Sequence, residues 1–406
     1  MCKKQLLVRL TLLIVLVGPA ALIKAQEIPT VVSKHHVVVA SEPGRFLCWP
    51  ANNGIYIWGN EIVVGYEDWL YEDDNGGHSR SKDDPFYNHL ARSYDGGETW
   101  TTEDPDNYAG DVMATEPCPG DVNFAHPDFA LYCTYAGMGE PVSPRGDDWF
   151  VSYDRGHTWE GPWLLPTFLD RETLARTDYI VNGPEDCMLF LSVNKSDGDE
   201  GVPLLAQTTD GGRTIDFLSW IGPEPPPGRS GGFAIQPAGV RCSDTKLICA
   251  IRRYERGRDE AVIKVYSSTD NGESFQFLSD AADPGGSGNP PAMIRMKDGR
   301  FVIAYGHREE PYGIFATVST DEGQTWSEPI ILRDDGRNWD IGYCRTVQRP
   351  DGKIVTVYYY TTEQIVVHFI GATIWELESI FLDSDINQDG VVNFLDFATV
   401  LKAPLR

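Results

Sequence analysis

The sequence predicts an all-β protein, a six-bladed β-propeller built on recurring hairpins. One short signature occurs five times, and its starting positions step by 59, 56, 60 and 51 residues. Runs rich in β-branched and aromatic residues precede the copies, and almost no segment has the periodicity of a helix. A unit of about 50–60 residues suits one four-stranded blade. Residues 27–380 hold about six such units.

The signature, which we call the Asp box, reads Ser/Thr-x-Asp-x-Gly-x-Thr/Ser-aromatic, although Ile215 replaces the aromatic residue in the third copy. An Asp side chain accepts hydrogen bonds from turn amides, and Gly adopts the positive φ that a tight turn needs. The aromatic residue re-enters the sheet and covers the turn. We therefore expect the boxes to hold hairpins rather than to perform chemistry. They begin at Ser93, Ser152, Thr208, Ser268 and Ser319.

The last blade has no Asp box. It should contain the apolar runs 353–359 and 364–370, which follow the fifth box. An N-terminal strand from residues 31–40 could close the ring, and a closed propeller leaves few exposed sheet edges.

The N-terminus predicts export. Basic residues precede an apolar run from Leu10 to Ile23, and small residues follow, with Ala25 a suitable last residue before cleavage. This order is typical of a secretory signal peptide. The alternative, an uncleaved anchor, is disfavoured because the run is shorter than the roughly 20 residues that a spanning helix needs. We expect residues 1–25 to be removed, residues 26–380 to form the propeller, and the protein to be secreted, extracellular or periplasmic, with no membrane span.

The charge excludes some partners. The whole chain has a formal net charge of −26, and loss of the leader, which holds four basic residues and no acidic one, leaves about −30. Nucleic acids and anionic membranes require clustered positive charge, so neither is an expected partner. An anionic substrate would need a local arginine cluster.

The box pattern and the count of five resemble the sialidase superfamily over nearly all of residues 27–380. The resemblance implies a six-bladed propeller in which three arginines grip the carboxylate of a sialic acid. It also implies a Tyr nucleophile assisted by a Glu, with an Asp as acid/base. At the matching positions stand Arg45, Arg252 and Arg308 for the arginines and Tyr343 for the nucleophile.

These residue types suit the chemistry. Guanidinium groups form bidentate, charge-assisted bonds to a planar carboxylate. A Tyr nucleophile avoids the repulsion that a carboxylate would feel beside an anionic sugar. A free phenol has a pKa of about 10, so it needs a base. The family's Glu falls on Gln236, whose amide cannot take a proton. Either another carboxylate serves, with Glu185 and Glu224 as candidates, or the Tyr mechanism is absent.

The acid/base should lie on the loop from Trp69 to His89. That loop carries His78 and four aspartates, of which we expect Asp83 or Asp84 to be the acid; the other two are Asp73 and Asp74. A further arginine, Arg345, lies two residues after Tyr343. Alternating strand geometry would point both side chains the same way. Arg345 could thus replace or supplement one of the three arginines.

Residues 381–406 predict a single EF-hand-like segment. They contain a twelve-position calcium loop with Gly390 at the turn, and no catalytic cofactor is expected elsewhere. Asp at the last position resembles dockerin-type repeats, which implies a cohesin-like partner, although a dockerin carries two repeats and this chain carries one. The expected Ca²⁺ ligands are Asp385, Asn387, Asp389, the backbone carbonyl of Val391, Asn393 and Asp396.

The leading functional hypothesis is a secreted exo-glycosidase of sialidase type that releases a terminal acidic sugar from glycoconjugates with retention. A propeller that binds carbohydrate without cleaving it is the first alternative, because Gln236 replaces the expected base. The second alternative is a glycosidase for another acidic sugar, such as a uronic acid. The fold alone does not separate these three.

Overall fold

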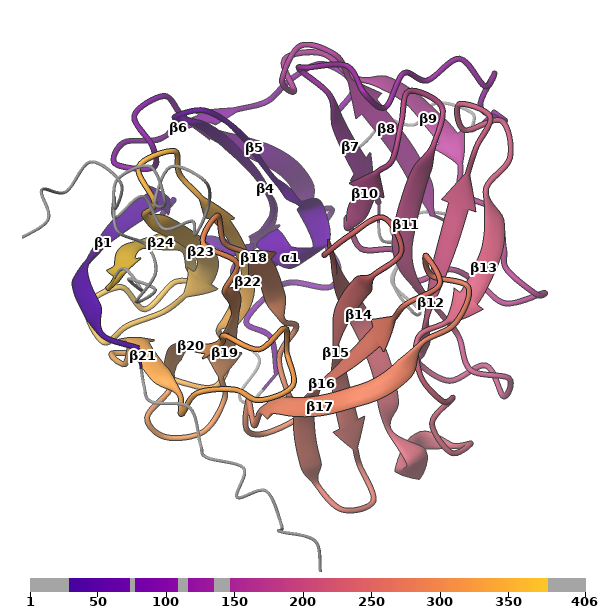
Figure 1. Cartoon of the computed structure of the whole chain (residues 1–406). Helices are drawn as coiled ribbons and strands as arrows, with labels where there is room; N and C mark the ends of the chain where they lie inside the picture. Colours follow the sequence, from indigo (N-terminus) through magenta and orange to yellow (C-terminus); the bar gives the residue numbers. More distant parts are fainter. Residues whose placement is uncertain (1–28, 74–76, 109–115, 135–146, 379–406) are drawn as a thin grey trace, which may run out of the picture.

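A computed structural model describes residues 29–73, 77–108, 116–134 and 147–378. Within them the strands form six antiparallel sheets arranged as blades around a central axis (Figure 1). This confirms the all-β, six-bladed propeller. The predicted leader, Asp74 and the predicted calcium loop lie outside the described residues.

The blades follow one another along the chain. The first contains β2 (Arg45–Cys48), β3 (Ile55–Trp58), β4 (Glu61–Leu70), β5 (Tyr87–Ser93) and β6 (Thr101–Glu103), with the helix α1 (Pro50–Asn53) before β3. The second contains β7 (Ala130–Cys133), β8 (Asp148–Ser152) and β9 (Glu160–Leu164). The third contains β10 (Tyr179–Val181), β11 (Cys187–Val193), β12 (Val202–Thr208) and β13 (Asp216–Trp220).

A short 3₁₀ turn, Arg229–Gly231, leads into the fourth blade. That blade contains β14 (Phe233–Arg241), β15 (Leu247–Glu255), β16 (Glu260–Ser268) and β17 (Gln276–Ala282). The fifth contains β18 (Ala292–Arg295), β19 (Phe301–His307), β20 (Gly313–Ser319) and β21 (Ile330–Arg333). The sixth contains β22 (Gly342–Gln348), β23 (Ile354–Tyr360) and β24 (Phe369–Leu377), joined by β1 (Val31–Ala40).

The first strands of successive blades meet near the axis. Strand β14 contacts β10 and β18, and β18 contacts β22. Helix α1 contacts β7 and β22, so the ring of inner elements closes through the first blade. Residues at the ends of these inner strands are thereby brought together from distant parts of the sequence.

The first and last strands of the propeller close the ring by pairing with each other. Strand β1 is the outer strand of the sixth blade and pairs antiparallel with β24, from Val31 opposite Leu377 to Ala40 opposite Ile370 (Figure 1). This confirms the closing strand expected at residues 31–40. The pairing leaves the first strand of the described residues hydrogen-bonded to the last.

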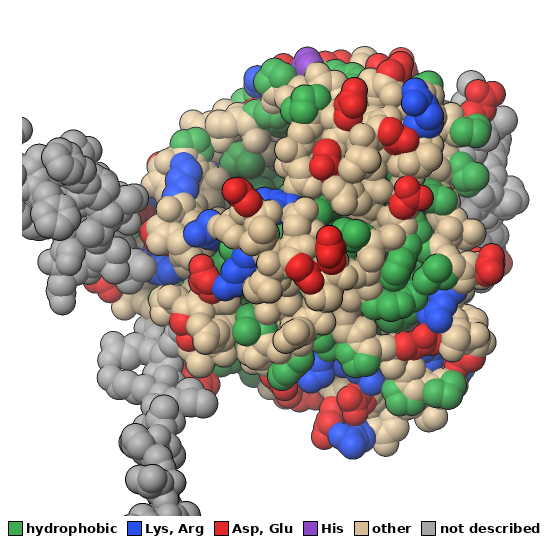
Figure 2. All heavy atoms as spheres, turned by 45° about the vertical axis from the view of Figure 1, so that its right-hand side comes forward, with side chains coloured by type: hydrophobic (Ala, Val, Ile, Leu, Met, Phe, Trp, Pro, Cys, Tyr) green, Lys and Arg blue, Asp and Glu red, His purple; other side chains and the backbone are tan. Residues whose placement is uncertain are grey.

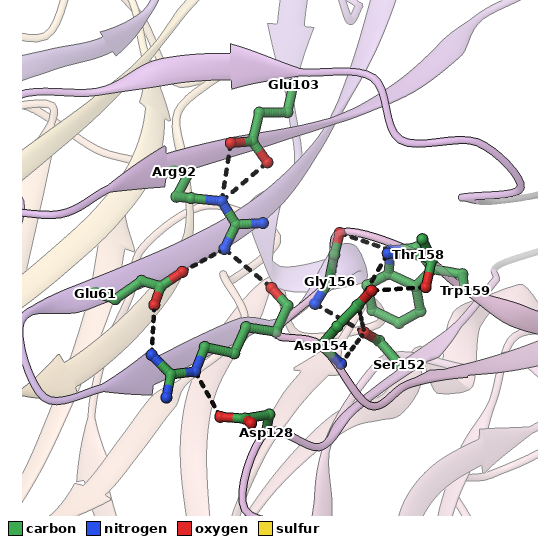
Figure 3. Close-up of polar contacts among 10 residues, drawn as sticks. Glu61, Arg92, Glu103, Asp128, Ser152, Asp154, Gly156, Thr158 and Trp159 are labelled. Carbon is green, nitrogen blue, oxygen red and sulfur yellow. Dashed lines mark hydrogen bonds and ion pairs between the residues drawn. The ribbon is translucent and has the colours of Figure 1, made fainter.

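Each Asp box forms the turn between the last two strands of its blade. In the second box, Asp154 accepts hydrogen bonds from the backbone N–H and the hydroxyl of Thr158, at 2.9 and 2.7 Å (Figure 3). Ser152 Oγ accepts the N–H of Gly156, whose φ is +85°. The indole of Trp159 donates to the Gly156 carbonyl at 3.1 Å. These internal bonds agree with a structural role for the boxes.

A buried ion network joins the first two blades (Figure 3). The guanidinium of Arg92, on β5, is fully buried and bonds Glu61 of β4 at 2.7 Å and Glu103 of β6 at 2.8 Å. The other oxygen of Glu61 pairs with Arg155 in the second box at 2.8 Å. Arg155 also pairs with Asp128 at 2.6 Å. The Glu61–Arg155 ion pair, with a hydrogen bond from Arg92 to the Arg155 carbonyl, thus links the two blades, and the other ion pairs hold these side chains in place.

The apolar core lies in the layers between adjacent sheets. Between the sixth and first blades, for example, Val355 and Tyr359 pack with Phe46 and Trp69. All seven described cysteines are free thiols. No described helix is long and apolar enough to cross a bilayer. Acidic side chains are scattered over the face shown in Figure 2, as the net charge of −26 leads one to expect.

Candidate active site

Tyr343 stands at the start of β22, on an unusual stretch of backbone. Its own φ is +47° and that of Gly342 is +104°. The buried Asn289 accepts the Tyr343 N–H at 2.8 Å and donates to the carbonyl of Ile341 at 2.9 Å. A Cβ at Gly342 would meet the Asn289 amide at 2.6 Å, so this position requires glycine. The left-handed conformation at Tyr343 costs on the order of 1–3 kcal/mol, and such strain clusters at functional sites.

Gln236 occupies a second strained position. It lies in β14 with φ +58°, and the pairing with β15 shifts register between Ile235 and Ala238. The bulge includes Pro237, which has no N–H for the ladder. The Gln236 N–H is instead held by Ser192 Oγ at 3.1 Å. A bulge re-aims a side chain, and here it turns Gln236 toward β15.

Arg252 on β15 joins these two residues. Its Nη1 donates to Gln236 Oε1 at 3.2 Å and to Tyr343 Oη at 3.3 Å. Its Nη2 donates to the carbonyl of Ser287 at 2.9 Å. The guanidinium is buried, and desolvation lowers its pKa, with Arg308 as a further cationic contribution in the same direction.

Arg308 follows β19 and approaches Tyr343 from the fifth blade. Its guanidinium carbon lies 5.6 Å from the centre of the Tyr343 ring and 5.2 Å from that of Trp339. Its Nη2 donates to Tyr359 Oη at 3.1 Å, whereas its buried Nε has no hydrogen-bond partner among the described residues. Two guanidinium groups therefore flank one phenol.

Neither Arg252 nor Arg308 forms an ion pair with a carboxylate in the described part of the chain, although both are buried. Other largely buried arginines have such a partner. Arg92 pairs with Glu61, Arg300 with Asp298 at 2.6 Å, and Arg345 with Asp178 at 3.0 Å. A buried charge without a counter-ion is costly, and a bound anion would offset that cost.

The cationic surroundings act on the phenol of Tyr343. Desolvation by the surrounding protein opposes its ionisation, but Arg252, Arg308 and Arg176 stabilise the phenolate, and the Gln236 amide adds to their effect. The net result is a pKa below the ordinary value of 10. This is the direction that a nucleophilic phenol needs.

Two further charged residues of the site were missed by sequence reasoning. Arg176 is buried before β10 and contributes to the lowered pKa of Tyr343. Glu67, on β4, accepts hydrogen bonds from Asn52 and Trp69, each at 3.0 Å. Burial raises the pKa of Glu67, against the effect of those bonds and of Arg176. Neither residue belongs to a repeated pattern that a single sequence displays.

Aromatic rings pack near Tyr343. Trp49 lies 6.2 Å from both Tyr343 and Trp69, centre to centre, and Arg80 lies 4.1 Å from the centre of Trp69. The indole N–H of Trp49 is buried and has no partner among the described residues. Flat apolar faces beside polar donors suit the faces and hydroxyls of a sugar.

The third expected arginine has other contacts. Arg45, at the start of β2, donates to Asp68 Oδ1 at 2.6 Å and lies over Tyr87. Its charge is therefore matched by a neighbouring carboxylate. The structure brings Arg252, Arg308, Tyr343 and Gln236 together by direct contacts, and gives Arg45 contacts with Asp68 and Tyr87 instead.

Arg345 also differs from the expectation of a shared direction with Tyr343. It pairs with Asp178 and donates to the backbone carbonyls of Ala51 and Thr177. Strand alternation fails here because β22 bulges: Gly342 pairs with Tyr359, whereas Arg345 pairs with Val357. These contacts tie β22 to α1 and to the start of the third blade.

The acid and base candidates lie elsewhere. Asp83 and Asp84 are exposed, and Asp84 accepts a hydrogen bond from Ser81 at 2.9 Å. Glu224 pairs with Arg171 at 2.9 Å, and Glu185 is exposed, its carbonyl accepting the Gly211 N–H. These contacts are with residues outside the group around Tyr343.

Fold and site define a class: a six-bladed propeller of Asp-box blades with an arginine–tyrosine centre. The family model described as "BNR repeat-like domain" matches residues 129–356, more than half of the chain, and the chain belongs to this family. No curated protein matches the chain significantly.

Solved structures share the fold at low identity. A protein of unknown function from Dyadobacter fermentans has 20% identity and a TM-score of 0.64, covering 84% of this chain and 98% of its own. The Hadza microbial sialidase Hz136 has 13% identity and a TM-score of 0.52, and the match covers 82% of this chain and 65% of the sialidase. The NanB sialidase from Streptococcus pneumoniae has 11% identity and a TM-score of 0.51, and the match covers 81% of this chain and 69% of the sialidase.

Proposed function

We propose that this protein is a secreted glycoside hydrolase of sialidase type, which releases a terminal acidic sugar, sialic acid first among the candidates, from glycoconjugates. One observation carries the proposal. Two buried guanidinium groups, Arg252 and Arg308, flank Tyr343 without a carboxylate partner in the described residues. In a chain with a net charge of −26, such a local concentration of positive charge suits an anionic ligand.

The proposed reaction uses these residues in order. The sugar carboxylate binds to Arg252 and Arg308. The Tyr343 phenolate attacks the anomeric carbon while the glycosidic C–O bond breaks, and an acid of the loop between Trp69 and His89 protonates the departing oxygen. Water then attacks the anomeric carbon from the face that the departing group has left, the phenolate of Tyr343 is released, and one proton of the water restores the acid. Two displacements give retention.

The positive charge of the neighbouring guanidinium groups compensates for the absence of a Glu at position 236. A carboxylate would take the phenolic proton, whereas the guanidinium groups lower the pKa of Tyr343 and so increase its phenolate fraction. Gln236 holds Arg252 at 3.2 Å and keeps the fork in place. The same residue supports a second candidate function, a propeller that binds acidic sugars without cleaving them.

The decisive experiment compares the purified protein with Tyr343→Phe on a fluorogenic sialoside and on a fluorogenic glucuronide. We expect turnover of the sialoside by the unmodified protein and its loss in the variant. Tyr94→Phe, at a tyrosine that is 66% exposed, serves as the matched control. Turnover of the glucuronide alone would change the proposed substrate from a sialic acid to a uronic acid. Binding of sialic acid without turnover would favour the lectin-like function, and neither binding nor turnover would refute both.

The terminal segments add two proposals that rest on sequence. The mass of the exported protein would show whether the chain is cleaved after Ala25. Ca²⁺ binding by residues 385–396 would be measured by calorimetry on the full chain, with Asp389→Ala as the variant that loses it. A cohesin-like partner would depend on that loop.

A further inference from the structure

His78 and Asp340 form a pair at the edge of the candidate site. His78 Nδ1 lies 2.7 Å from Asp340 Oδ1. The carboxylate is 2% exposed, whereas the imidazole is 32% exposed. Among the described residues only Nδ1 of the ring is hydrogen-bonded, which leaves Nε2 for a ligand.

The carboxylate is anchored from several elements. Tyr359, on β23, donates to Asp340 Oδ1 at 2.5 Å, and the Asp340 N–H is held by Asn338 at 2.9 Å. His368 donates to the Asp340 carbonyl at 2.9 Å. Burial opposes ionisation of Asp340, yet His78, His368 and Tyr359 bring its pKa down to about 2. A fixed, ionised carboxylate selects the tautomer of His78 that has its proton on Nδ1 when neutral.

The pair is linked to the arginine–tyrosine centre through intervening side chains. Arg308 donates to Tyr359, which donates to Asp340, so three hydrogen bonds lead from Arg308 to His78. The His78 ring also packs 5.1 Å from Trp49 and 5.4 Å from Trp339. Trp49 contacts Tyr343 and Trp339 contacts Arg308, so one aromatic residue separates His78 from each.

We propose that His78 is the general acid of the reaction and that Asp340 is its positioning residue. This inference rests on the proposed function and changes its acid from an aspartate to a histidine of the same loop. His78 is partly exposed, has a free ring nitrogen and is joined to the site, whereas Asp83 and Asp84 are exposed and turn to Ser81. Glu67 is buried with both oxygens already accepting hydrogen bonds.

The proton balance is simple. In the first step imidazolium Nε2–H protonates the glycosidic oxygen as the bond from that oxygen to the anomeric carbon breaks and the phenolate oxygen of Tyr343 bonds to the same carbon. In the second step neutral Nε2 takes a proton from water as the water oxygen attacks the anomeric carbon, and the bond from that carbon to Tyr343 breaks to release the phenolate. The imidazolium is restored, and Asp340 stabilises it without taking its proton.

The test compares two substrates that differ in how much they need an acid. An aryl sialoside has a leaving phenoxide that departs unaided, whereas an alkyl-linked sialoside such as sialyllactose requires protonation. We expect His78→Gln to lower kcat for the alkyl substrate by about 10²–10⁴-fold and for the aryl substrate by less than about 10-fold. Asp340→Asn should change the ratio of kcat for the aryl substrate to kcat for the alkyl substrate in the same direction. His157→Gln, at an exposed histidine of the second Asp box, is the matched control.

The outcomes separate this inference from the proposed function. Equal losses on both substrates, or no loss, would overturn the role of His78 while turnover dependent on Tyr343 stood. No turnover of either substrate by the unmodified protein would overturn both. Binding of sialic acid and the thermal unfolding midpoint report whether each variant is folded. His78→Phe, which keeps a ring but carries no proton, repeats the comparison should His78→Gln unfold.

Discussion

The guanidinium of Arg252 donates a hydrogen bond of 3.3 Å to the phenolic oxygen of Tyr343, which lies 91 residues further along the chain. The two residues come from the fourth and sixth blades, and Arg308 of the fifth completes the group. The contact links a cation that has no carboxylate partner among the described residues to a phenol whose pKa it lowers. In the proposed reaction, binding of the substrate and reactivity of the nucleophile thus depend on the same side chain.

Arg252→Gln should weaken the binding of sialic acid. Charge-assisted hydrogen bonds contribute about 1.5–3 kcal/mol, so we expect Kd to rise by roughly 10- to 100-fold. Arg258→Ala, at a largely exposed arginine of the β15–β16 hairpin, should leave Kd unchanged. Calorimetric titration at constant ionic strength measures both. An unchanged Kd for Arg252→Gln would remove this residue from the ligand site.

Gln236→Glu should raise the pKa of Tyr343. A carboxylate 3.2 Å from Arg252 would pair with that guanidinium and bring negative charge beside the phenol, which disfavours phenolate. The ultraviolet titration of each protein minus that of its Tyr343→Phe counterpart isolates this one tyrosine. Gln236→Met, which removes the amide without adding charge, is the control. A fall in the pKa for Gln236→Glu would contradict the electrostatic account.

Arg92→Met should destabilise the fold. The variant leaves Glu103 without its ion pair and Glu61 with only Arg155, and breaking a buried ion pair costs about 3–5 kcal/mol. Urea unfolding followed by tryptophan fluorescence gives the change. The more exposed Arg155→Met should cost less, because water solvates that end of the network. Equal losses for the two variants would argue against burial as the cause.

The Asp boxes should make stability depend on pH in the acid range. Hydrogen bonds from Ser274 and Ser268 hold the pKa of Asp270 at about 2, below the value of about 3.9 for an unfolded chain. A depressed folded pKa gives stability that is full above pH 4 and is lost as the pH falls toward 2. Asp270→Asn should therefore lower the urea midpoint at pH 7, and the difference should shrink toward pH 2.

The neighbouring Glu273→Gln, in the same box, is the comparison for that measurement. It should change the midpoint little at either pH, since its side chain is exposed. A difference for Asp270→Asn that stayed constant from pH 7 to pH 2 would show that the hydrogen bonds, and not the charge, carry the effect.

The propeller could be predicted because its determinants are local. Each box fixes a hairpin through residues no more than seven apart, and the spacing then sets the blade length. The blade boundaries were not determined locally. Each box lies before the last strand of its blade, so a blade ends one strand after its box. The strand at 31–40 was also predicted to close the ring, but its pairing with β24 depends on residues more than 300 positions away.

The site was predicted in part, and the reason is geometric. Arg308 and Tyr343 stand at strand ends and Arg252 lies within β15, and the resemblance supplied their register. Arg176 comes from a loop without a repeated pattern, and only the fold brings it near Tyr343. The bulge at Tyr343 could not be read from the sequence, because it depends on Asn289, 54 residues away.

The pairing of β1 with β24 has a consequence for biogenesis. The first segment of the propeller to leave the ribosome pairs with the last, and Val31 must wait for Leu377 to be synthesised. The sixth blade, with Tyr343 on its inner strand, therefore cannot be completed until its last strand has left the ribosome. An engineered permutation that joins residue 378 to residue 29 and opens the chain elsewhere should relieve that delay.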